Sequence, residues 1–261
     1  MKFMFFFYPA IPGTLDEREK LRPSAARTDR FQQMLSESVE LSQFAEDLAF
    51  RAVTFPEHHL HTEGGEMGSL PLLTRHVLAD TKKIMAGPIG SIRRAAREGL
   101  IPTLLGADYV ELRRFAELHV EGTAKHGRQL KLGENLGAFR GVDMADIKAQ
   151  AHELAMKGLM GTGWPGWAHY FGSTDAFRLP EDDLKYPGQT LPLSEIKMER
   201  FDKAHFTLSG NASDVRRDME DLVAAANPEW FIWQGDQGYL PLDDCKRIME
   251  RFAREVMPHY V

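Results

Sequence analysis

The stretch AEDLAFRAVTFPEHHL, residues 45–60, decides the fold class of this chain of 261 residues. It ends a pattern that begins near Phe31, in which apolar residues recur at helical spacing and predict a one-sided helix. Residues 51–55 then form a short apolar run, which is typical of a buried strand. A polar PEHH segment follows at once. The stretch therefore predicts a helix, a strand and a polar loop in succession.

Strands and helices alternate along most of the chain. Further strands are expected at residues 2–11, 83–86, 101–105, 130–139 and 230–233. Helices are expected at about residues 29–49, 70–82, 91–99, 108–125, 144–157, 211–227 and from 242 onward, with Ser91 and Asp143 as N-caps of two of them. This alternation predicts right-handed βαβ units and a parallel sheet, so the expected fold class is α/β. The six expected strands are two fewer than in a closed eight-stranded barrel.

Residues 158–207 form the irregular part of the sequence. They hold several aromatic residues, including Trp164 and Trp167, and prolines at positions 165, 180, 187 and 192. A loop of this length in a compact domain is usually a functional lid or a disordered segment. Its tryptophans could cover a flat aromatic ligand or pack a subunit interface. The sequence has no internal repeat or evident linker, so a single domain over residues 1–261 with a lid at about 158–207 is expected.

Composition excludes several classes of function. The net charge is −6, so a general nucleic-acid binder that relies on phosphate contacts is not expected. The single cysteine, Cys245, excludes an internal disulfide framework and a Cys-rich zinc site, and is expected to be a small core residue. The longest apolar run, residues 4–11, is too short for a membrane span of about 20 residues, and no signal-peptide cleavage site follows it. We therefore expect no membrane partner and a cytoplasmic location.

Three histidines, His58, His59 and His61, lie directly after the strand expected at residues 51–55. In α/β folds, ligand chemistry lies on the loops that follow the carboxyl ends of strands. An imidazole there can act as a general base, because it takes up and returns a proton near neutral pH. Two alternatives stay open. One is a polar loop without a chemical role, and the other is a metal site, since imidazole is a common zinc ligand and the two rings of an H-x-H pair point the same way on an extended segment.

A second candidate is the turn that runs from Gly87 through Pro88 and Gly90 to Ser91. Glycines between a strand and a helix N-terminus let backbone N–H groups approach an anion, and the helix dipole favours negative charge there. The Ser91 hydroxyl and the positive charge of Arg93 or its neighbour would add to such a site. The alternative is a short strand-to-helix connection that binds nothing.

Two further strand ends carry polar residues. Asp236 and Gln237 follow the strand expected at residues 230–233, whose alternating aromatic residues are more typical of a core than of a ligand platform. Arg140 follows the strand expected at residues 130–139 and could bind a ligand or form a surface ion pair.

Four segments resemble the bacterial luciferase-like flavin monooxygenases. Residues 45–60 resemble that family's AEDLGFDAVWFPEHHF, and residues 91–100, SIRRAAREGL, resemble its ESIRRAAREGLP turn and helix. Residues 140–143 resemble its R-x-V-Y-V strand, and residues 236–258, which begin DQGYLP and end FAREVMP, resemble its DQGGLP and FAEEVMP. The resemblance covers most of the chain except residues 158–207.

The resemblance implies a (β/α)₈ barrel that binds reduced FMN, or in some branches the deazaflavin F420, at the carboxyl ends of its strands. It implies that His58 is the catalytic base and His59 its neighbour. It assigns the flavin phosphate to the turn of Gly87, Pro88, Gly90 and Ser91. The family has several further βα units at the place where this chain passes directly through residues 83–87. We therefore expect a TIM-barrel-like (β/α) fold that is trimmed relative to (β/α)₈.

The leading hypothesis is a flavin-dependent monooxygenase that uses O₂ and reduced FMN, supplied by a separate flavin reductase, to oxygenate a small organic substrate. F420 is the alternative cofactor. A second hypothesis is a non-catalytic flavin-binding homologue that is stabilised as a dimer, because an open sheet has edges that must be covered. The third is a metal-dependent hydrolase with His59, His61 and Asp236 as ligands. A homodimer and a transient reductase are the expected protein partners.

Overall fold

The computed structural model describes residues 1–7, 9–13, 17, 20, 27–56, 70–88, 100–105, 108–160, 178–179, 181–235 and 240–261. The chain folds as two compact units whose segments alternate along the sequence. The first unit holds Gly90–Met156 and Gly163–Ile232, and the second holds Lys2–Ile89, Lys157–Thr162 and Trp233–Val261. The single domain expected over residues 1–261 stays a prediction.

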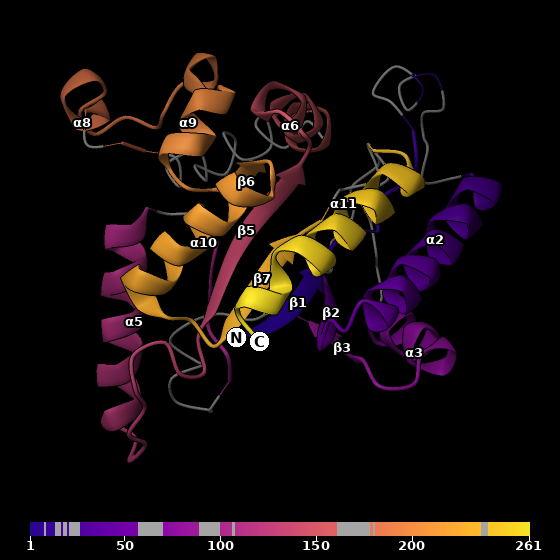
Figure 1. The fold of residues 1–261 in the computed structure, drawn as a ribbon, viewed down its shortest axis with the longest axis horizontal. Helices are drawn as coiled ribbons and strands as arrows, with labels where there is room; N and C mark the ends of the chain where they lie inside the picture. The colour runs from indigo at the N-terminus through magenta and orange to yellow at the C-terminus, as the bar shows by residue number, and fades with distance from the viewer. Residues whose placement is uncertain are drawn as a thin grey trace. The chain divides into compact units, whose positions relative to one another are not determined.

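Parallel strands form the sheet of the second unit (Figure 1). In order across that sheet they are β3 (Met85–Pro88), β2 (Ala52–Phe55), β1 (Lys2–Phe6) and the end of β7 (Trp230–Gln234). The register pairs Phe6 with Thr54 and Phe55 with Pro88, so the strands end at a similar level. All of β2 and nearly all of β1 are buried, as expected for parallel strands covered on both faces.

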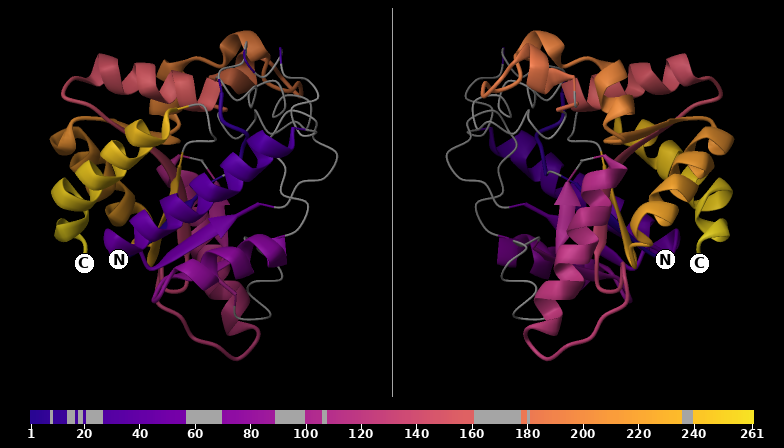
Figure 2. Two further views of the ribbon diagram at one scale, coloured as in Figure 1. Left: turned by 90° about the vertical axis from the view of Figure 1, so that its right-hand side faces the viewer. Right: turned by 90° about the vertical axis from the view of Figure 1, so that its left-hand side faces the viewer.

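In the described part of the unit, this sheet is accompanied by the helices α2 (Thr28–Asp47), α3 (Leu70–Asp80) and α11 (Leu242–Glu255), and a turn of 3₁₀ helix follows at Met257–His259. In the second unit α2 packs against both α3 and α11, and α3 packs against β3 (Figure 2). The helices expected at residues 29–49 and 70–82 are therefore confirmed. Cys245 is buried on α11, as expected for a core residue.

Aromatic rings fill the space between β1 and these helices. Phe5 lies 5.5 Å from Trp233, and Phe3 lies 5.7 Å from Phe252 of α11, in edge-to-face arrangements measured between ring centroids. Residues at alternate positions of a strand share one face, so Phe3 and Phe5 face the helices while Phe6 faces the other side of the sheet. Edge-to-face pairs add about 0.5–1.5 kcal/mol each to the effect of burying the rings.

The first unit has its own parallel strands, β4 (Thr103–Leu105), β5 (Gly137–Met144) and β6 (Thr207–Gly210), together with the start of β7. The first half of β5 pairs with β4, and its second half pairs with β6. The helical segments of this unit are α5 (Tyr109–Ala124), α6 (Lys148–Ala155), α8 (Asp182–Lys185), a 3₁₀ turn (Leu193–Glu195), α9 (Met198–Lys203) and α10 (Ala212–Ala226). A π-helical turn, Met156–Met160, continues α6.

Side-chain caps fix the ends of two long helices. The Asn211 side chain accepts from the backbone N–H groups of Ser213 and Asp214, and Asp214 accepts from the Asn211 N–H, which is a capping box. Asn227 ends α10 in the left-handed conformation that asparagine tolerates. Asp108 caps α5 in the same manner, through the N–H of Glu111. The helices expected at residues 211–227 and 108–125 are thus confirmed.

The described part of the segment that was expected to be irregular, residues 178–179 and 181–207, is ordered by ion pairs. The Arg200 guanidinium forms two hydrogen bonds with the Asp182 carboxylate and a third with Glu195 at 3.2 Å. Arg178 donates to the backbone carbonyl of Tyr186 at 2.6 Å. Trp164 and Trp167 lie outside the described residues, so a lid at this place stays a prediction.

The parallel α/β architecture with flanking helices is confirmed, and each of the six expected strands is present. Three local expectations are wrong. Asp143 lies inside β5 and caps no helix, Gly87 and Pro88 are the last residues of β3 rather than part of a turn, and β6 was not expected as a strand. With β6 the described residues hold seven strands, one fewer than a (β/α)₈ barrel.

None of the described helices combines the length and apolar character that a membrane crossing requires.

Candidate functional site

The carboxyl ends of four strands meet in the second unit. The backbone N–H of Gly235, directly after β7, donates to the Phe6 carbonyl at the end of β1 at 2.6 Å. The N–H of Phe7 donates to the Thr54 carbonyl of β2 at 3.2 Å. Pro88, the last residue of β3, is the register partner of Phe55. The ends of β3, β2, β1 and β7 therefore lie side by side in that order, as the parallel pairing requires.

Three of the segments that the sequence nominated follow these strand ends. His58 comes three positions after the end of β2, Gly90 two positions after the end of β3, and Asp236 two positions after the end of β7. The nominated residues that lie outside the described part of the chain are His58, His59, His61, Gly90, Ser91, Arg93, Asp236 and Gln237. The structure thus brings together the strand ends that carry them, and the roles of these residues stay predictions.

Two buried polar side chains that the sequence did not nominate lie at the same strand ends. Thr54 and Gln234 are only 5% and 7% exposed. Among the described residues, neither the Thr54 hydroxyl nor the Gln234 carbonyl oxygen has a hydrogen-bond partner. Thr54 is the register partner of Phe6, so the two side chains lie on the same face of the sheet. Gln234 is next to Trp233 in β7, so its side chain lies on the face opposite that of Trp233. Both therefore face away from the helices, where a ligand could satisfy them, since unpaired buried polar groups are costly.

A second group of polar side chains lies in the first unit, near the carboxyl ends of β5 and β6. Asp143 pairs in register with Ser209, and Gly141 with Thr207, so all four positions share one face of the sheet. Asp143, Thr207 and Ser209 are 9%, 2% and 1% exposed. No feature of the sequence marked them, because Ser and Thr are mostly exposed in proteins and only the structure shows that these two are buried.

Arg140 lies on the opposite face of β5 and is fully buried. Its guanidinium donates to the Phe139 carbonyl at 2.8 Å, and burial lowers the pKa of Arg140 to about 10. Nearby, the rings of Tyr109 and His205 stack at 3.9 Å, and the Tyr109 hydroxyl donates to the backbone carbonyl of Asp218 at 2.8 Å. Burial, and then the charge of Arg140, lower the pKa of His205 and favour its neutral form. A surface ion pair for Arg140 is therefore wrong, and this cluster joins β5 to α5 and α10.

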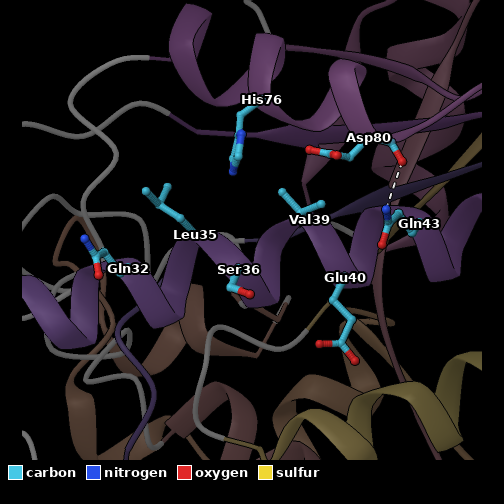
Figure 3. A pocket seen from close by; sticks show the side chains of 8 residues that line it. All are labelled: Gln32, Leu35, Ser36, Val39, Glu40, Gln43, His76 and Asp80. Carbon is cyan, nitrogen blue, oxygen red and sulfur yellow. Dashed lines mark hydrogen bonds between the residues drawn. The ribbon is translucent and has the colours of Figure 1, made fainter.

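A groove also lies between α2 and α3, with a volume of about 570 Å³ (Figure 3). Leu35 and Val39 of α2 and His76 of α3 point into it, and Gln43 spans the two helices by donating to the Asp80 carbonyl at 2.9 Å. All of its lining residues belong to these two helices and none follows a strand. It is therefore separate from the strand ends described above.

Metal ligation has no support in the described part of the chain. No cluster of three or more His, Cys, Asp or Glu side chains in those residues could hold a metal ion. The three ligands of the hydrolase hypothesis, His59, His61 and Asp236, lie outside those residues. That hypothesis stays untested.

Neither a protein-family model nor a curated protein matches the sequence. Solved structures do match. The oxygenating constituent of 3,6-diketocamphane monooxygenase from Pseudomonas putida, in complex with FMN, matches with a TM-score of 0.75 at 12% identity over 100% of this chain and 99% of its own. A monooxygenase from Streptomyces bottropensis matches with a TM-score of 0.71 at 13% identity over 100% of both chains. The chain has the luciferase-like fold.

A protein with this fold also uses another cofactor, coenzyme F420. A coenzyme F420-dependent tetrahydromethanopterin reductase from Methanopyrus kandleri matches with a TM-score of 0.52 at 12% identity over 87% of this chain and 96% of its own. At these identities the comparisons establish the luciferase-like fold, which confirms the fold that the sequence motifs implied. Chemistry at the strand ends must be argued from the residues themselves.

Proposed function

We propose that this chain is a flavin-dependent oxidoreductase, specifically a monooxygenase that uses reduced FMN and O₂ to oxygenate a small organic substrate. One observation carries the proposal, namely the likeness over the full length of the chain to an oxygenating enzyme constituent that was solved with FMN. The sequence motifs around His58 and Ser91 agree with it. F420 is the alternative cofactor, since an F420-dependent reductase has the same fold.

The buried polar groups of the second unit fit a flavin. The edge of a flavin ring carries carbonyl oxygens and an N–H group, so it needs both donors and acceptors from the protein. The Thr54 hydroxyl can donate or accept, and the Gln234 carbonyl oxygen can accept, and neither has a partner among the described residues. These two side chains would hold the ring, while Gly90, Ser91 and Arg93 would hold the phosphate.

When bound, a reduced flavin supplies the electrons for oxygen activation. The chain's own residues then have three tasks. His58 holds or moves a proton at an imidazole nitrogen, as a general acid or base does. The apolar residues around Thr54 and Phe6 keep water away from the reaction. A separate flavin reductase supplies the reduced cofactor, and a homodimer is the proposed assembly.

The experiment is an anaerobic titration of the full chain with reduced FMN, oxidised FMN and F420, followed by flavin fluorescence. We expect tighter binding of reduced than of oxidised FMN, and oxidation of the bound flavin once air is admitted. Binding of FMN without turnover of any substrate would favour the non-catalytic homologue. Failure of both cofactors to bind would contradict the proposal.

A matched pair of variants tests the ring contacts. Thr54→Val keeps the shape of the side chain but removes the hydroxyl, so we expect FMN binding to weaken about 3- to 10-fold, the effect of one neutral hydrogen bond. Thr81→Val is the control, because the Thr81 hydroxyl donates to the Val77 carbonyl at the end of α3, away from the strand ends. Equal FMN affinity in all three proteins would rule out the contact.

A further inference from the structure

Thr54, Phe6 and Gln234 form a row across three neighbouring strands, and all three belong to the second unit. Thr54 is the register partner of Phe6, and the N–H of Phe7, one position after Phe6, donates to the Thr54 carbonyl. In the same way the N–H of Gly235, one position after Gln234, donates to the Phe6 carbonyl, so Gln234 lies beside Phe6 in β7. The three side chains therefore share the sheet face that points away from the helices.

The two polar members of this row cannot satisfy each other. Neighbouring strands lie about 4.8 Å apart, so Thr54 and Gln234, on the strands either side of β1, are separated by two strand spacings, or about 10 Å. The Phe6 side chain lies between them in the row. The Thr54 hydroxyl and the Gln234 carbonyl oxygen are buried and have no hydrogen-bond partner among the described residues. Since unpaired buried polar groups destabilise a protein, both indicate a ligand that reaches across β1.

Gln234 needs a donor from that ligand, because its carbonyl oxygen only accepts hydrogen bonds, whereas the Thr54 hydroxyl both donates and accepts. The oxidised flavin ring has a single N–H donor, at N3, which lies between two carbonyl oxygens in a cyclic imide. A carboxamide matches this imide edge, since it presents an acceptor and a donor side by side. The other polar atoms of the oxidised ring are acceptors, to which the Thr54 hydroxyl can donate.

We propose that Gln234 recognises the imide edge of the flavin ring, with its carbonyl oxygen accepting from N3–H and its amide N–H donating to a neighbouring ring carbonyl. This inference rests on the proposed flavin-dependent function and assigns the part of the cofactor that meets β7. Gln234 thereby selects ligands by their N–H group. The deazaflavin F420 has the same imide edge, so the contact applies to either cofactor.

The test compares FMN with 3-methyl-FMN, in which a methyl group replaces the hydrogen at N3. Both are titrated into the full-length parent protein, and binding is followed by flavin fluorescence. We expect 3-methyl-FMN to bind at least about 10-fold more weakly, because the buried carbonyl loses its donor and meets a methyl group. Equal affinities would mean that water satisfies the amide, and would overturn the proposal.

Two variants connect this preference to Gln234. Gln234→Leu removes the amide, so FMN and 3-methyl-FMN should bind it with affinities within about threefold of each other. Gln43→Leu is the control, because the Gln43 amide donates to the Asp80 carbonyl between α2 and α3, and this variant should keep the full preference. A preference that persists undiminished in Gln234→Leu would overturn the assignment.

Thermal unfolding without flavin separates a ligand contact from a structural one. Loss of a buried carbonyl that has no partner should leave the Tm of Gln234→Leu unchanged or raise it. A fall of a few degrees or more would show that the amide supports the fold, and would overturn the proposal.

Lumichrome and 3-methyllumichrome repeat the comparison with a ring that lacks the phosphate chain. A preference for lumichrome in a protein that binds neither FMN nor F420 would support the imide contact while contradicting the proposed function. Binding of FMN without a preference in either pair of probes would leave the function standing and overturn the contact. No binding of any of these ligands would overturn both.

Discussion

At the scale of single residues, Glu46 shows how one carboxylate shapes the second unit. Its oxygens accept hydrogen bonds from the backbone N–H groups of three successive residues, Lys82, Lys83 and Ile84, directly before β3. These bonds, that of Lys83 first, lower the pKa of Glu46 below its ordinary 4.5. The carboxylate thereby fixes the path by which the chain enters β3, and β3 leads to the proposed phosphate turn.

Replacing Glu46 with glutamine should lower the urea midpoint of unfolding at neutral pH, because a neutral amide accepts these bonds less strongly. The folded pKa is depressed, so the stabilisation is complete above about pH 4.5 and is lost as the pH falls through the folded value. The difference between Glu46→Gln and the parent protein should therefore vanish in acid. Glu220→Gln, on the exposed side of α10, is the control. A difference that persists at low pH would contradict the role of the charge.

His58 is the proposed proton-transfer residue, so His58→Ala should leave FMN affinity unchanged while lowering kcat at least about 100-fold. The measurement is single turnover of the reduced holoenzyme with O₂ and substrate. The control is His126→Ala, which removes an exposed histidine just after α5. Turnover that survives in His58→Ala would show the base assignment to be wrong.

The sequence predicted some of these residues and missed others. The histidines after β2 were predicted as candidates because several of them directly follow an expected strand. Thr54 and Gln234 were not predicted, because each is a single polar residue in an apolar strand. Only the structure shows that their polar atoms are buried without a hydrogen-bond partner among the described residues. The place of Asp143 inside β5 was missed because an aspartate before a helical pattern is typical of an N-cap.

At the scale of elements, the end of α10 is held by a turn that only glycine can form. Gly133 has a φ of +81°, and a Cβ there would lie 1.9 Å from the Asn227 carbonyl oxygen. The Gly133 carbonyl accepts from the N–H of Glu229 at 2.8 Å, and the Glu229 carboxylate accepts from the N–H of Asn135 at 2.8 Å. The turn before β5 and the start of β7 are thus joined through the end of α10.

Gly133→Ala should therefore destabilise the protein by at least about 3 kcal/mol, because it combines a strained backbone with a clash against backbone atoms. Urea unfolding followed by circular dichroism measures the loss. Gly127→Ala separates the two causes, since Gly127 has a φ of +78° but nothing within 4 Å of a Cβ atom. If both variants lose the same stability, the contact with Asn227 contributes nothing.

The element pattern was predictable wherever apolar periodicity was strong. The six expected strands and the capped helices followed from it, although their bounds shifted by a few residues. β6 escaped prediction because Thr207–Gly210 is short and half polar, and polar residues in a short segment indicate a loop. In the structure Thr207 and Ser209 share a sheet face with Asp143.

At the scale of the whole molecule, each unit depends on segments that are distant in sequence. In the second unit, Phe252 of α11 contacts Phe3 and Trp233, and Lys246 of α11 pairs with Glu40 of α2. The core of this unit therefore includes the packing of α11 on β1, two elements at opposite ends of the described sequence. Loss of any of its aromatic residues should therefore lower the stability of the whole unit.

Phe252→Ala should lower the free energy of unfolding by about 3–5 kcal/mol, because it leaves a cavity beside two rings. Tryptophan fluorescence should report the change, since Trp233 lies 5.3 Å from Phe252. Val110→Ala, at a position that is 75% exposed, should change stability by no more than about 0.5 kcal/mol. A loss below about 1 kcal/mol for Phe252→Ala would contradict the packing of α11 on β1.

The packing of α11 on β1 also has a consequence for synthesis on the ribosome. Glu40 and Lys246 are 206 positions apart, so at translation rates of about 5–20 residues per second the second of them is made about 10–40 s after the first. Throughout that interval the phenylalanines of β1 have no α11 to cover them. Until α11 emerges, the apolar surface of β1 is therefore exposed to aggregation, which a chaperone or a provisional strand pairing would prevent.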